Sequence, residues 1–281
     1  MRIIRDIPYT ETDGIPQLLD LYLPEGDGPF PVVVWIHGGS WTIYNRLKID
    51  DPQYLLDAGF AVAAIDYRLT TSAPFPAMIV DCQSAVRWLR EHHQRYGLLA
   101  ARIGAMGPSA GGHLAALLAL TPHIAWDGAV HSQSAEIQAV VPVCPITDLE
   151  AIWPFWVQER SDVPELTGMI TGFCGGNPAE HVALMRHASP LSHVAAGAPP
   201  FHLFHGDADP TVPIAHSQRL VEALHAFGVA AKLTISAGTG HVGIDGYPQP
   251  AETRSTIVAF FARHVMHASG RRSEASKQAE A

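Results

Sequence analysis

Short apolar stretches alternate with longer segments of helical periodicity along most of this chain. Residues 18–23 (LLDLYL) have the pattern of a half-buried strand, whereas residues 31–36 (PVVVWI) form the continuous apolar run of a strand covered on both faces. Apolar residues recur at helical spacing over about 77–93, which predicts an amphipathic helix. The same reasoning predicts further strands at 60–65, 102–106, 139–143, 201–204 and 231–235, and further helices at 51–58, 113–120, 216–227 and 253–265.

This alternation predicts a single α/β domain over residues 1–269. Repeated β-α units give a mostly parallel, twisted sheet with helices on both faces. Residues 148–180 interrupt the pattern with aromatic residues, prolines and glycines that follow no clean period. They are expected to form a small lid over the carboxyl edge of the sheet, although surface helices packed on the body fit the same pattern. Residues 270–281 are small, polar and charged, and are expected to be a disordered tail.

Composition narrows the class of function. The 281 residues carry a net charge of −9 with no basic run before the tail, which argues against a nucleic-acid partner. The amino terminus has no apolar core as long as an export signal or a membrane span, so a cytoplasmic protein without a membrane partner is expected. Cys82, Cys144 and Cys174 are odd in number and widely spaced, which predicts buried thiols rather than disulfides or a metal cluster.

The segment Gly107-Pro108-Ser109-Ala110-Gly111 lies between the predicted strand at 102–106 and the predicted helix at 113–120. A serine flanked by glycines at such a turn has the pattern of a nucleophile elbow. The glycines leave room for the tight turn, while the serine hydroxyl is exposed. The helix that follows directs its N–H groups and dipole toward any oxyanion that forms beside Ser109.

A serine needs a base to take its proton and an acid to hold that base in the right tautomer. The acid is expected after the strand at 201–204, where Asp207 and Asp209 compete. Asp207 lies at the turn itself, and Asp209 lies further out on the loop, which favours Asp209. The base is expected after the last strand, where His241 stands in a glycine-flanked loop and completes the order Ser, Asp, His.

The predicted strand at 31–36 is followed by His37-Gly38-Gly39-Ser40-Trp41. Glycines let a backbone approach a substrate oxygen, so the N–H groups of Gly39 and Ser40 are expected to form an oxyanion hole together with the N–H of Ala110. His37 is expected to brace this loop rather than to act as a base.

The motifs HGGSW, DYRL, GPSAGGHLA, HASPLSHV, HGDADPTVP and GTGHV occur here in the order and spacing of α/β-hydrolase esterases. The set resembles the branch of bifunctional feruloyl and acetylxylan esterases, with the hormone-sensitive-lipase group nearby, and the resemblance extends from about Ile7 to His264. It implies an α/β-hydrolase fold, the triad Ser109, Asp209 and His241, and the three oxyanion donors named above. The DYRL segment is expected to be a salt-bridged structural loop. Pro108 departs from the many relatives that have an acidic residue at that position.

These residues predict a serine carboxylesterase that hydrolyses short-acyl esters, such as acetyl or feruloyl esters, through an acyl-enzyme and without a metal or organic cofactor. Its expected partner is a small-molecule ester, and a homo-oligomer is compatible with the sequence. An arylformamidase that resembles kynurenine formamidases is the alternative enzyme, and a catalytically inactive receptor is an alternative of another class. The aromatic side chains expected to contact substrate are Trp41, Trp153, Phe155 and Trp156.

Overall fold

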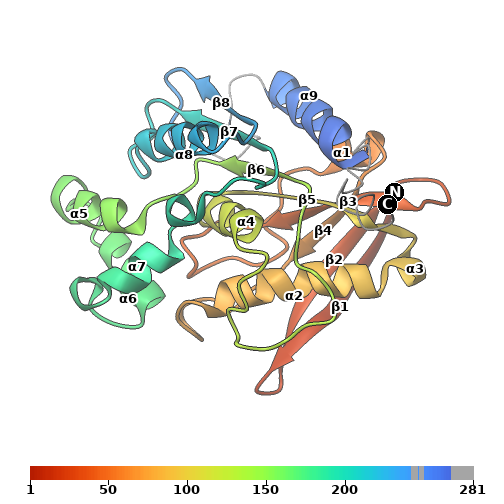
Figure 1. The fold of residues 1–281 in the computed structure, drawn as a ribbon, viewed down its shortest axis with the longest axis horizontal. Helices are drawn as coiled ribbons and strands as arrows, with labels where there is room; N and C mark the ends of the chain where they lie inside the picture. The colour runs from red at the N-terminus through yellow and green to blue at the C-terminus, as the bar shows by residue number, and fades with distance from the viewer. Residues whose placement is uncertain (242–245, 247–249, 267–281) are drawn as a thin grey trace, which may run out of the picture.

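The structure is a computed structural model that describes residues 1–241, 246 and 250–266. The tail predicted at 270–281 lies outside the described residues, as do 267–269 at the end of the predicted domain. An eight-stranded sheet has the order β1-β2-β4-β3-β5-β6-β7-β8 (Figure 1). Its strands are β1 (Arg2–Thr12), β2 (Ile15–Leu23), β3 (Phe30–Ile36), β4 (Ala61–Ile65), β5 (Leu98–Pro108), β6 (Ala139–Val143), β7 (Phe201–Gly206) and β8 (Ala231–Ser236).

Helices connect most of these strands. The α-helices are α1 (Gln53–Asp57), α2 (Ala77–Glu91), α3 (His93–Tyr96), α4 (Ala110–Leu120), α5 (Leu149–Glu159), α6 (Glu165–Cys174), α7 (Val182–Ala188), α8 (Ala215–Ala226) and α9 (Pro250–Phe261). Short 3₁₀-helices are η1 (Pro178–Glu180) and η2 (Pro190–His193), and the π-helical turn η4 (Ala262–Met266) follows α9.

The sheet is mostly parallel, as the sequence predicts. β1 pairs with β2, and β2 with β4, in antiparallel fashion, whereas the neighbouring strands from β4 through β3 to β8 all pair in parallel. Parallel strands end at the same edge of a sheet, so the loops that follow β3, β5, β6, β7 and β8 meet there. The candidate catalytic residues all lie on these loops.

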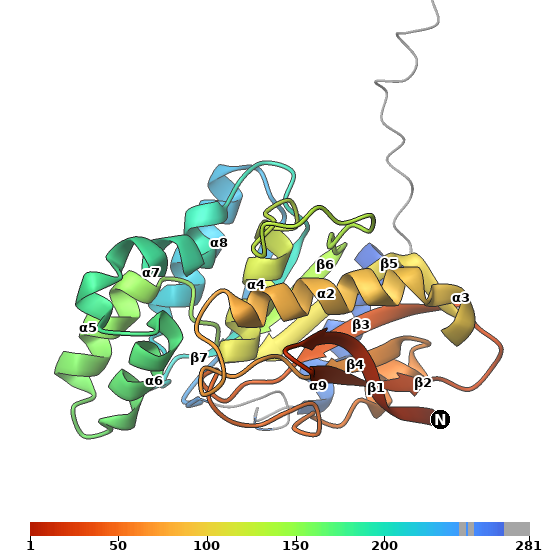
Figure 2. The ribbon, with the colours of Figure 1, turned by 90° about the horizontal axis from the view of Figure 1, so that it is seen from below.

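Helices cover both faces of the sheet, and β3 shows why. Its side chains point alternately to opposite faces. Val32, Val34 and Ile36 pack in the hydrophobic cluster that includes α2 and α4. Val33 and Trp35 pack in a second cluster with α1 and α9. Figure 2 shows α2 and α4 together on one side of the sheet. The continuous apolar run at 31–36 is therefore buried on both faces.

The residues that interrupt the α/β alternation form α5, α6 and neighbouring short helices, grouped at one end of the molecule (Figure 1). They are anchored to the loops at the carboxyl edge of the sheet. The N–H of Phe75 donates to the carbonyl oxygen of Phe173 in α6 at 2.9 Å. The Phe173 ring in turn lies 4.6 Å from that of Trp41, between centroids. The insertion is thus packed on the body at the edge where the site lies, and its role as a lid stays a prediction.

Strand β1, at the edge of the sheet, is not predicted from the sequence. β1 pairs with β2 in an irregular register, which shifts between Ile4 and Ile7 and again between Pro8 and Thr10. Such irregularities interrupt the two-residue alternation by which a strand is recognised in a sequence.

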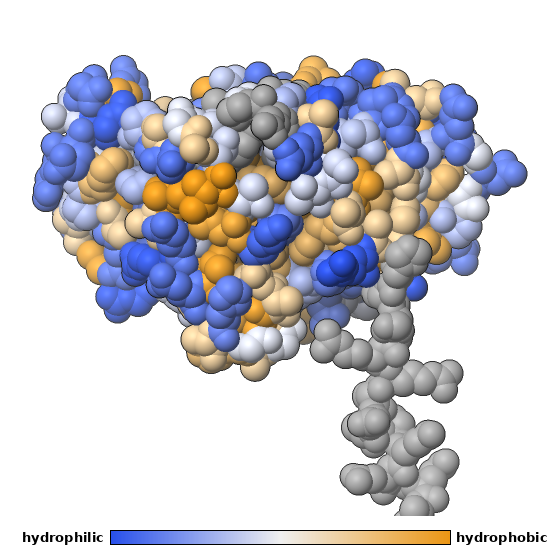
Figure 3. All heavy atoms as spheres, turned by 90° about the horizontal axis from the view of Figure 1, so that it is seen from above, coloured by the Kyte–Doolittle hydropathy of each residue, from blue (hydrophilic) through white to orange (hydrophobic). Residues whose placement is uncertain are grey.

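None of the helices in the described part of the chain combines the length and the apolar character needed to cross a bilayer. On the face shown in Figure 3, apolar side chains reach the surface in separate areas among hydrophilic ones.

Candidate active site

Ser109 lies at the sharp turn between β5 and α4. Its backbone angles are φ 55° and ψ −120°, which a residue with a side chain rarely adopts. A Cβ added to Gly107 would lie 2.2 Å from the carbonyl oxygen of Ile36, and one added to Gly111 would lie 2.0 Å from the same oxygen. The turn passes so close to β3 that both positions require glycine, as the sequence pattern indicates.

The predicted oxyanion donors lie beside this turn. Gly39 and Ser40 both have positive φ, at 98° and 51°, in the loop after β3. A Cβ added to the preceding Gly38 would lie 3.6 Å from the Cβ of Ser109, so the backbone of this loop passes close to the serine. Ala110 is the first residue of α4, and an N–H in the first turn of a helix has no acceptor within that helix.

His37 supports the loop after β3, residues 37–41, which is the predicted oxyanion loop. Its side chain is buried and stacks on Tyr67, with ring centroids 4.2 Å apart. Its Nδ1 donates to the carbonyl oxygen of Gly38 at 2.7 Å, and the Tyr67 hydroxyl donates to the carbonyl oxygen of His37 at 3.0 Å. Burial lowers the pKa of His37, which favours the neutral ring. These contacts are those of a brace, and the ring is not exposed to take a proton from substrate.

Trp41 extends this bracing to two helices. Its indole N–H donates to Nδ1 of His113 in α4 at 3.1 Å, and Nε2 of His113 donates to the carbonyl oxygen of Ala188 at the end of α7 at 2.8 Å. Burial lowers the pKa of His113 to about 4, so the ring is neutral, as both hydrogen bonds require. Trp41 itself is fully buried. Its prediction as a substrate contact is therefore corrected: it is a core residue that fixes the oxyanion loop.

The DYRL segment is salt-bridged, although its partners lie elsewhere in the chain. Arg68 pairs with Asp81 in α2, with Nη2 and Oδ1 2.9 Å apart, and Asp66 pairs with Arg46, with Nη1 and Oδ2 2.7 Å apart. The segment is thus tied to α2 and to the loop after β3.

Asp209 and His241 are brought together by the loops after β7 and β8. Nδ1 of His241 donates to Oδ2 of Asp209 at 2.7 Å. Oδ1 of Asp209 accepts the backbone N–H groups of Thr211, at 2.8 Å, and Val212, at 2.9 Å. The Asp209 side chain is fully buried, whereas that of His241 is 22% exposed. The two backbone amides thus fix the carboxylate through Oδ1, and Oδ2 orients the imidazole.

The competing carboxylate, Asp207, is directed elsewhere. It is exposed, and its Oδ1 accepts the N–H of Gly238 at 2.6 Å. A histidine that the sequence analysis does not single out, His205 at the end of β7, is buried with Nε2 3.3 Å from Oδ2 of Asp209. Its position just beyond the predicted strand 201–204 is the signal that would have placed it near the acid.

Asp209 and His241 shift each other's pKa in opposite directions. Burial raises the pKa of Asp209, but hydrogen bonds from His205, His241 and the Val212 amide outweigh burial and leave the pKa well below its usual value. Burial lowers the pKa of His241, but Cys144 and Asp209 outweigh it and raise the pKa above its usual value. The ionised carboxylate therefore stabilises the imidazolium that forms when this base takes a proton.

Cys144, which is predicted from the sequence only as a buried thiol, lies beside Asp209 and His241. It follows β6 directly, has φ 39° and is 1% exposed. Its Sγ, a carboxylate oxygen of Asp209 and a ring nitrogen of His241 all lie within 4.8 Å of one another. The preceding residue, Val143, accepts the N–H of Ser109 at 2.8 Å, which joins this cluster to the elbow. Spacing along the chain predicts no metal cluster, yet the fold gathers three side chains with metal-ligating atoms.

The aromatic residues of α5 pack against the body of the protein. Trp156 is 1% exposed, and its indole N–H donates to the carbonyl oxygen of Thr211 at 2.8 Å. Its prediction as a substrate contact is corrected, because the side chain is in the core and steadies the loop of Asp209. Trp153 and Phe155 are half-buried and pack against the same cluster. Their contact with substrate stays a prediction.

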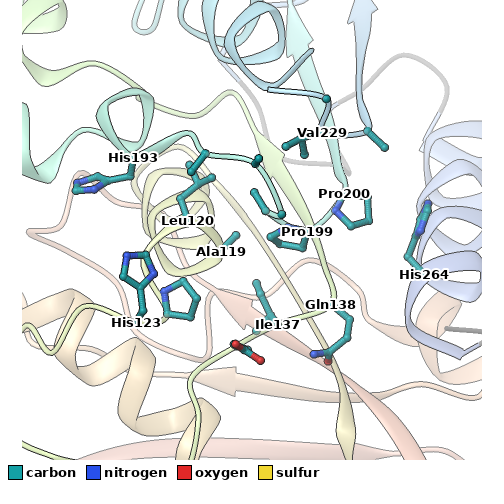
Figure 4. Close-up of a pocket in the computed structure, with 18 of the residues that line it drawn as sticks. Ala119, Leu120, His123, Ile137, Gln138, His193, Pro199, Pro200, Val229 and His264 are labelled. Carbon is teal, nitrogen blue, oxygen red and sulfur yellow. The ribbon is translucent and has the colours of Figure 1, made fainter. Parts of the chain in front are cut away.

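The surface of the described part of the protein is hollowed near the oxyanion loop and at the far end of α4. A polar hollow of about 320 Å³ adjoins the oxyanion loop and is lined in part by His37, Tyr44 and Thr71. A larger one of about 1010 Å³ lies at the carboxyl end of α4, where His123, His193 and His264 line it (Figure 4). An 11-residue helix is roughly 16 Å long, so the larger cavity is remote from Ser109.

The chain is similar to known proteins of one kind, the esterases. A profile of the family described as BD-FAE matches residues 19–224. Among curated proteins, the chain is similar to esterase LipQ of Mycobacterium tuberculosis, with 31% identity over 265 residues that cover 90% of this chain and 59% of LipQ. The chain therefore spans about three fifths of the length of that relative and 51% of a second, LipM.

Solved structures of similar proteins have the same fold. A bifunctional GH43-CE protein of Bacteroides eggerthii is 30% identical with a TM-score of 0.78, covering 93% of this chain and 35% of that one. A thermophilic esterase of Thermogutta terrifontis, Est2, solved with butyrate bound, is 26% identical with a TM-score of 0.75, covering 92% and 93% of the two chains.

Proposed function

Because the chain belongs to the BD-FAE family and shares the α/β-hydrolase fold of the esterases that resemble it, we propose that it is a serine carboxylesterase that hydrolyses short-acyl carboxylic esters through an acyl-enzyme. The observation that carries the proposal is the 2.7 Å hydrogen bond from His241 to the buried Asp209, on the edge of the sheet where Ser109 occupies a strained elbow. Such a pair supplies what a serine hydroxyl lacks, a base held in one tautomer.

In the proposed mechanism, Asp209 keeps the imidazole proton on Nδ1 of His241, so that Nε2 has a free lone pair. This nitrogen takes the proton of Ser109 as Oγ attacks the ester carbonyl, and later gives it to the departing alcohol. Water then attacks the acyl-enzyme by the same route and releases the acid. Because Asp209 raises the pKa of His241, the imidazolium formed in both steps is stabilised.

The negative charge that develops on the carbonyl oxygen is assigned to the N–H groups of Gly39, Ser40 and Ala110. The close approach of the oxyanion loop to Ser109 supports this assignment, as does the position of Ala110 in the first turn of α4. The buried contacts of His37 and Trp41 keep the loop in place before substrate arrives, and donors that need no rearrangement are the most effective in stabilising a transition state.

Replacing the nucleophile tests the proposal. Ser109→Ala is expected to lower kcat for p-nitrophenyl acetate by roughly 10⁴–10⁶-fold, because a triad without its nucleophile leaves only the oxyanion hole and binding. The thermal unfolding curve of the variant should stay close to that of the wild type, which separates loss of chemistry from loss of fold. Retention of more than a few per cent of the activity would contradict the proposal.

The acyl group and the bond type are resolved by a rate series with the purified protein. Rates on acetyl, butyryl, octanoyl and feruloyl esters rank the acyl groups, and N-formylkynurenine tests the arylformamidase alternative. We expect the highest kcat/KM on an acetyl or another short-acyl ester. A clear preference for the formamide would replace the esterase proposal with an amidase that uses the same residues.

A further inference from the structure

We propose that Cys144 turns the His241–Asp209 pair into an inhibitory binding site for a thiophilic divalent cation such as Zn²⁺. The inhibition rests on the proposed esterase function, but the binding does not. The three side chains come from the loops after three adjacent strands, β6, β7 and β8, so the sheet holds them in fixed relation. A thiol, an imidazole and a carboxylate are the three types of side chain that bind zinc in proteins.

The geometry suits a single small ion. The Sγ of Cys144, a ring nitrogen of His241 and a carboxylate oxygen of Asp209 all lie within 4.8 Å of one another. A tetrahedral zinc ion, with bonds of about 2.3 Å to sulfur and about 2.0–2.1 Å to nitrogen and oxygen, holds such ligand atoms about 3.3–3.6 Å apart. Each ligand atom therefore needs to move by only about an ångström, through rotation of its side chain, to bind the ion.

The charges also balance. The bound state has a Cys144 thiolate and a neutral His241 imidazole, whose single proton is on the nitrogen that does not bind; any further proton that the two groups carry is released to solvent. The thiolate and the Asp209 carboxylate then carry two negative charges, which neutralise the divalent cation. A neutral complex is what a buried location favours, because an uncompensated charge there is costly. Cys144 and Asp209 are buried, and the partly exposed His241 ring marks the side from which an ion enters.

Occupancy stops catalysis whichever nitrogen of His241 binds. An ion on Nε2 takes the lone pair that accepts the proton of Ser109. An ion on Nδ1 displaces that proton to Nε2, which then has no lone pair to offer. The thiol of Cys144 is thus the residue that adds metal sensitivity to an otherwise metal-free mechanism.

The first test measures binding without any catalysis. Full-length Ser109→Ala protein is titrated with Co²⁺, which replaces Zn²⁺ in such sites and gives a thiolate-to-cobalt absorption band in the near ultraviolet. The band is expected in Ser109→Ala and in its double variant with Cys174→Ser, a buried thiol in α6 that serves as the matched control. It is expected to be lost when Cys144→Ser is combined with Ser109→Ala. Absence of the band from Ser109→Ala, or its persistence without Cys144, overturns the proposal.

The second test measures inhibition. Zn²⁺ is titrated against hydrolysis of p-nitrophenyl acetate by the wild type, Cys144→Ser, Cys144→Ala and Cys174→Ser, each normalised to its own zinc-free rate. Loss of a group that only supports a metal ligand typically costs about 10–100-fold in metal affinity. Loss of the ligand itself should therefore raise the half-inhibitory zinc concentration of both Cys144 variants roughly tenfold or more, with Cys174→Ser unchanged. Equal inhibition of all four proteins would place the inhibitory ion elsewhere. A cobalt band in a protein without esterase activity would leave the site intact and refute the proposed function alone.

Discussion

Replacing Asp209 with asparagine isolates the orienting role of the carboxylate with little change in volume. The carboxylate accepts hydrogen bonds on both oxygens, from the amides of Thr211 and Val212 on Oδ1 and from His241 on Oδ2, where Nε2 of the buried His205 also lies 3.3 Å away. An asparagine has one oxygen and one NH₂ group to satisfy these donors. If its oxygen faces the two amides, its NH₂ group faces Nδ1 of His241 and forces the imidazole proton onto Nε2, where it prevents catalysis.

The opposite orientation keeps the productive tautomer but places the NH₂ group against two backbone N–H groups, that of the partly buried Thr211 and that of the buried Val212. Each buried donor left without an acceptor costs about 1–3 kcal/mol. The productive orientation of the substituted asparagine is therefore disfavoured by about 2–6 kcal/mol, and its population falls by roughly 30-fold to 3 × 10⁴-fold. We expect kcat/KM for p-nitrophenyl acetate to fall by a factor in that range in Asp209→Asn.

Asp207→Asn is the matched control, because Asp207 lies two residues away on the same loop and is exposed. Its activity should stay within about threefold of the wild type, since surface substitutions usually change free energies by less than about 0.5 kcal/mol. Circular dichroism and thermal unfolding of both variants verify the fold. If Asp209→Asn loses less than about fivefold, or if Asp207→Asn loses as much as Asp209→Asn, the assignment of the acid is wrong.

Three further predictions follow from the contacts of the site. His241 must be neutral to act as a base, and its raised pKa means that it becomes protonated as the pH falls through a value above the usual histidine pKa of about 6.5. The pH profile of kcat/KM should therefore reach half its maximum above about pH 6.5, and a midpoint at or below that pH contradicts the raised pKa. Gly111→Ala forces a Cβ against the Ile36 carbonyl oxygen and should lower the free energy of unfolding in urea by about 2–3 kcal/mol, whereas an unchanged denaturation midpoint would show that the elbow can relax. Trp41→Phe leaves buried His113 without its donor and should cost about 1–3 kcal/mol of stability together with part of kcat, and normal values for both would rule out the bracing role of the indole.

Much of this architecture can be predicted from the sequence because local patterns and tertiary packing agree along it. The strand at 139–143 is found at the predicted bounds, since an apolar run buried on both faces carries its own signal. The elbow is recognised because the glycines at 107 and 111 are required by contacts with the backbone of β3. The glycine pattern of the turn therefore records a three-dimensional restriction.

The remaining features depend on contacts that no local pattern records. Helix α5 contains Pro154 and packs against α6, α7 and the loop of Asp209 rather than on one flat face, so its periodicity is weak. Trp41 looks like a ligand contact in the sequence because it follows the oxyanion glycines, but its indole is directed into the core by the bond to His113. The position of Cys144 beside Asp209 and His241 cannot be read from the sequence, because it depends on the strand order, which sets β6 between β5 and β7.

The hydrogen-bonded path from Trp41 through His113 to Ala188 has a consequence for attempts to redesign the protein. Exchanging the helices after β6 for those of a relative, in order to alter which alcohols are accepted, would remove the far end of this path. A chimera of that kind needs residues 41 and 113 taken from the same donor as the helices. Without them, the graft would remove the support of residues 37–41, next to Ser109, while changing the helices that were meant to alter substrate choice.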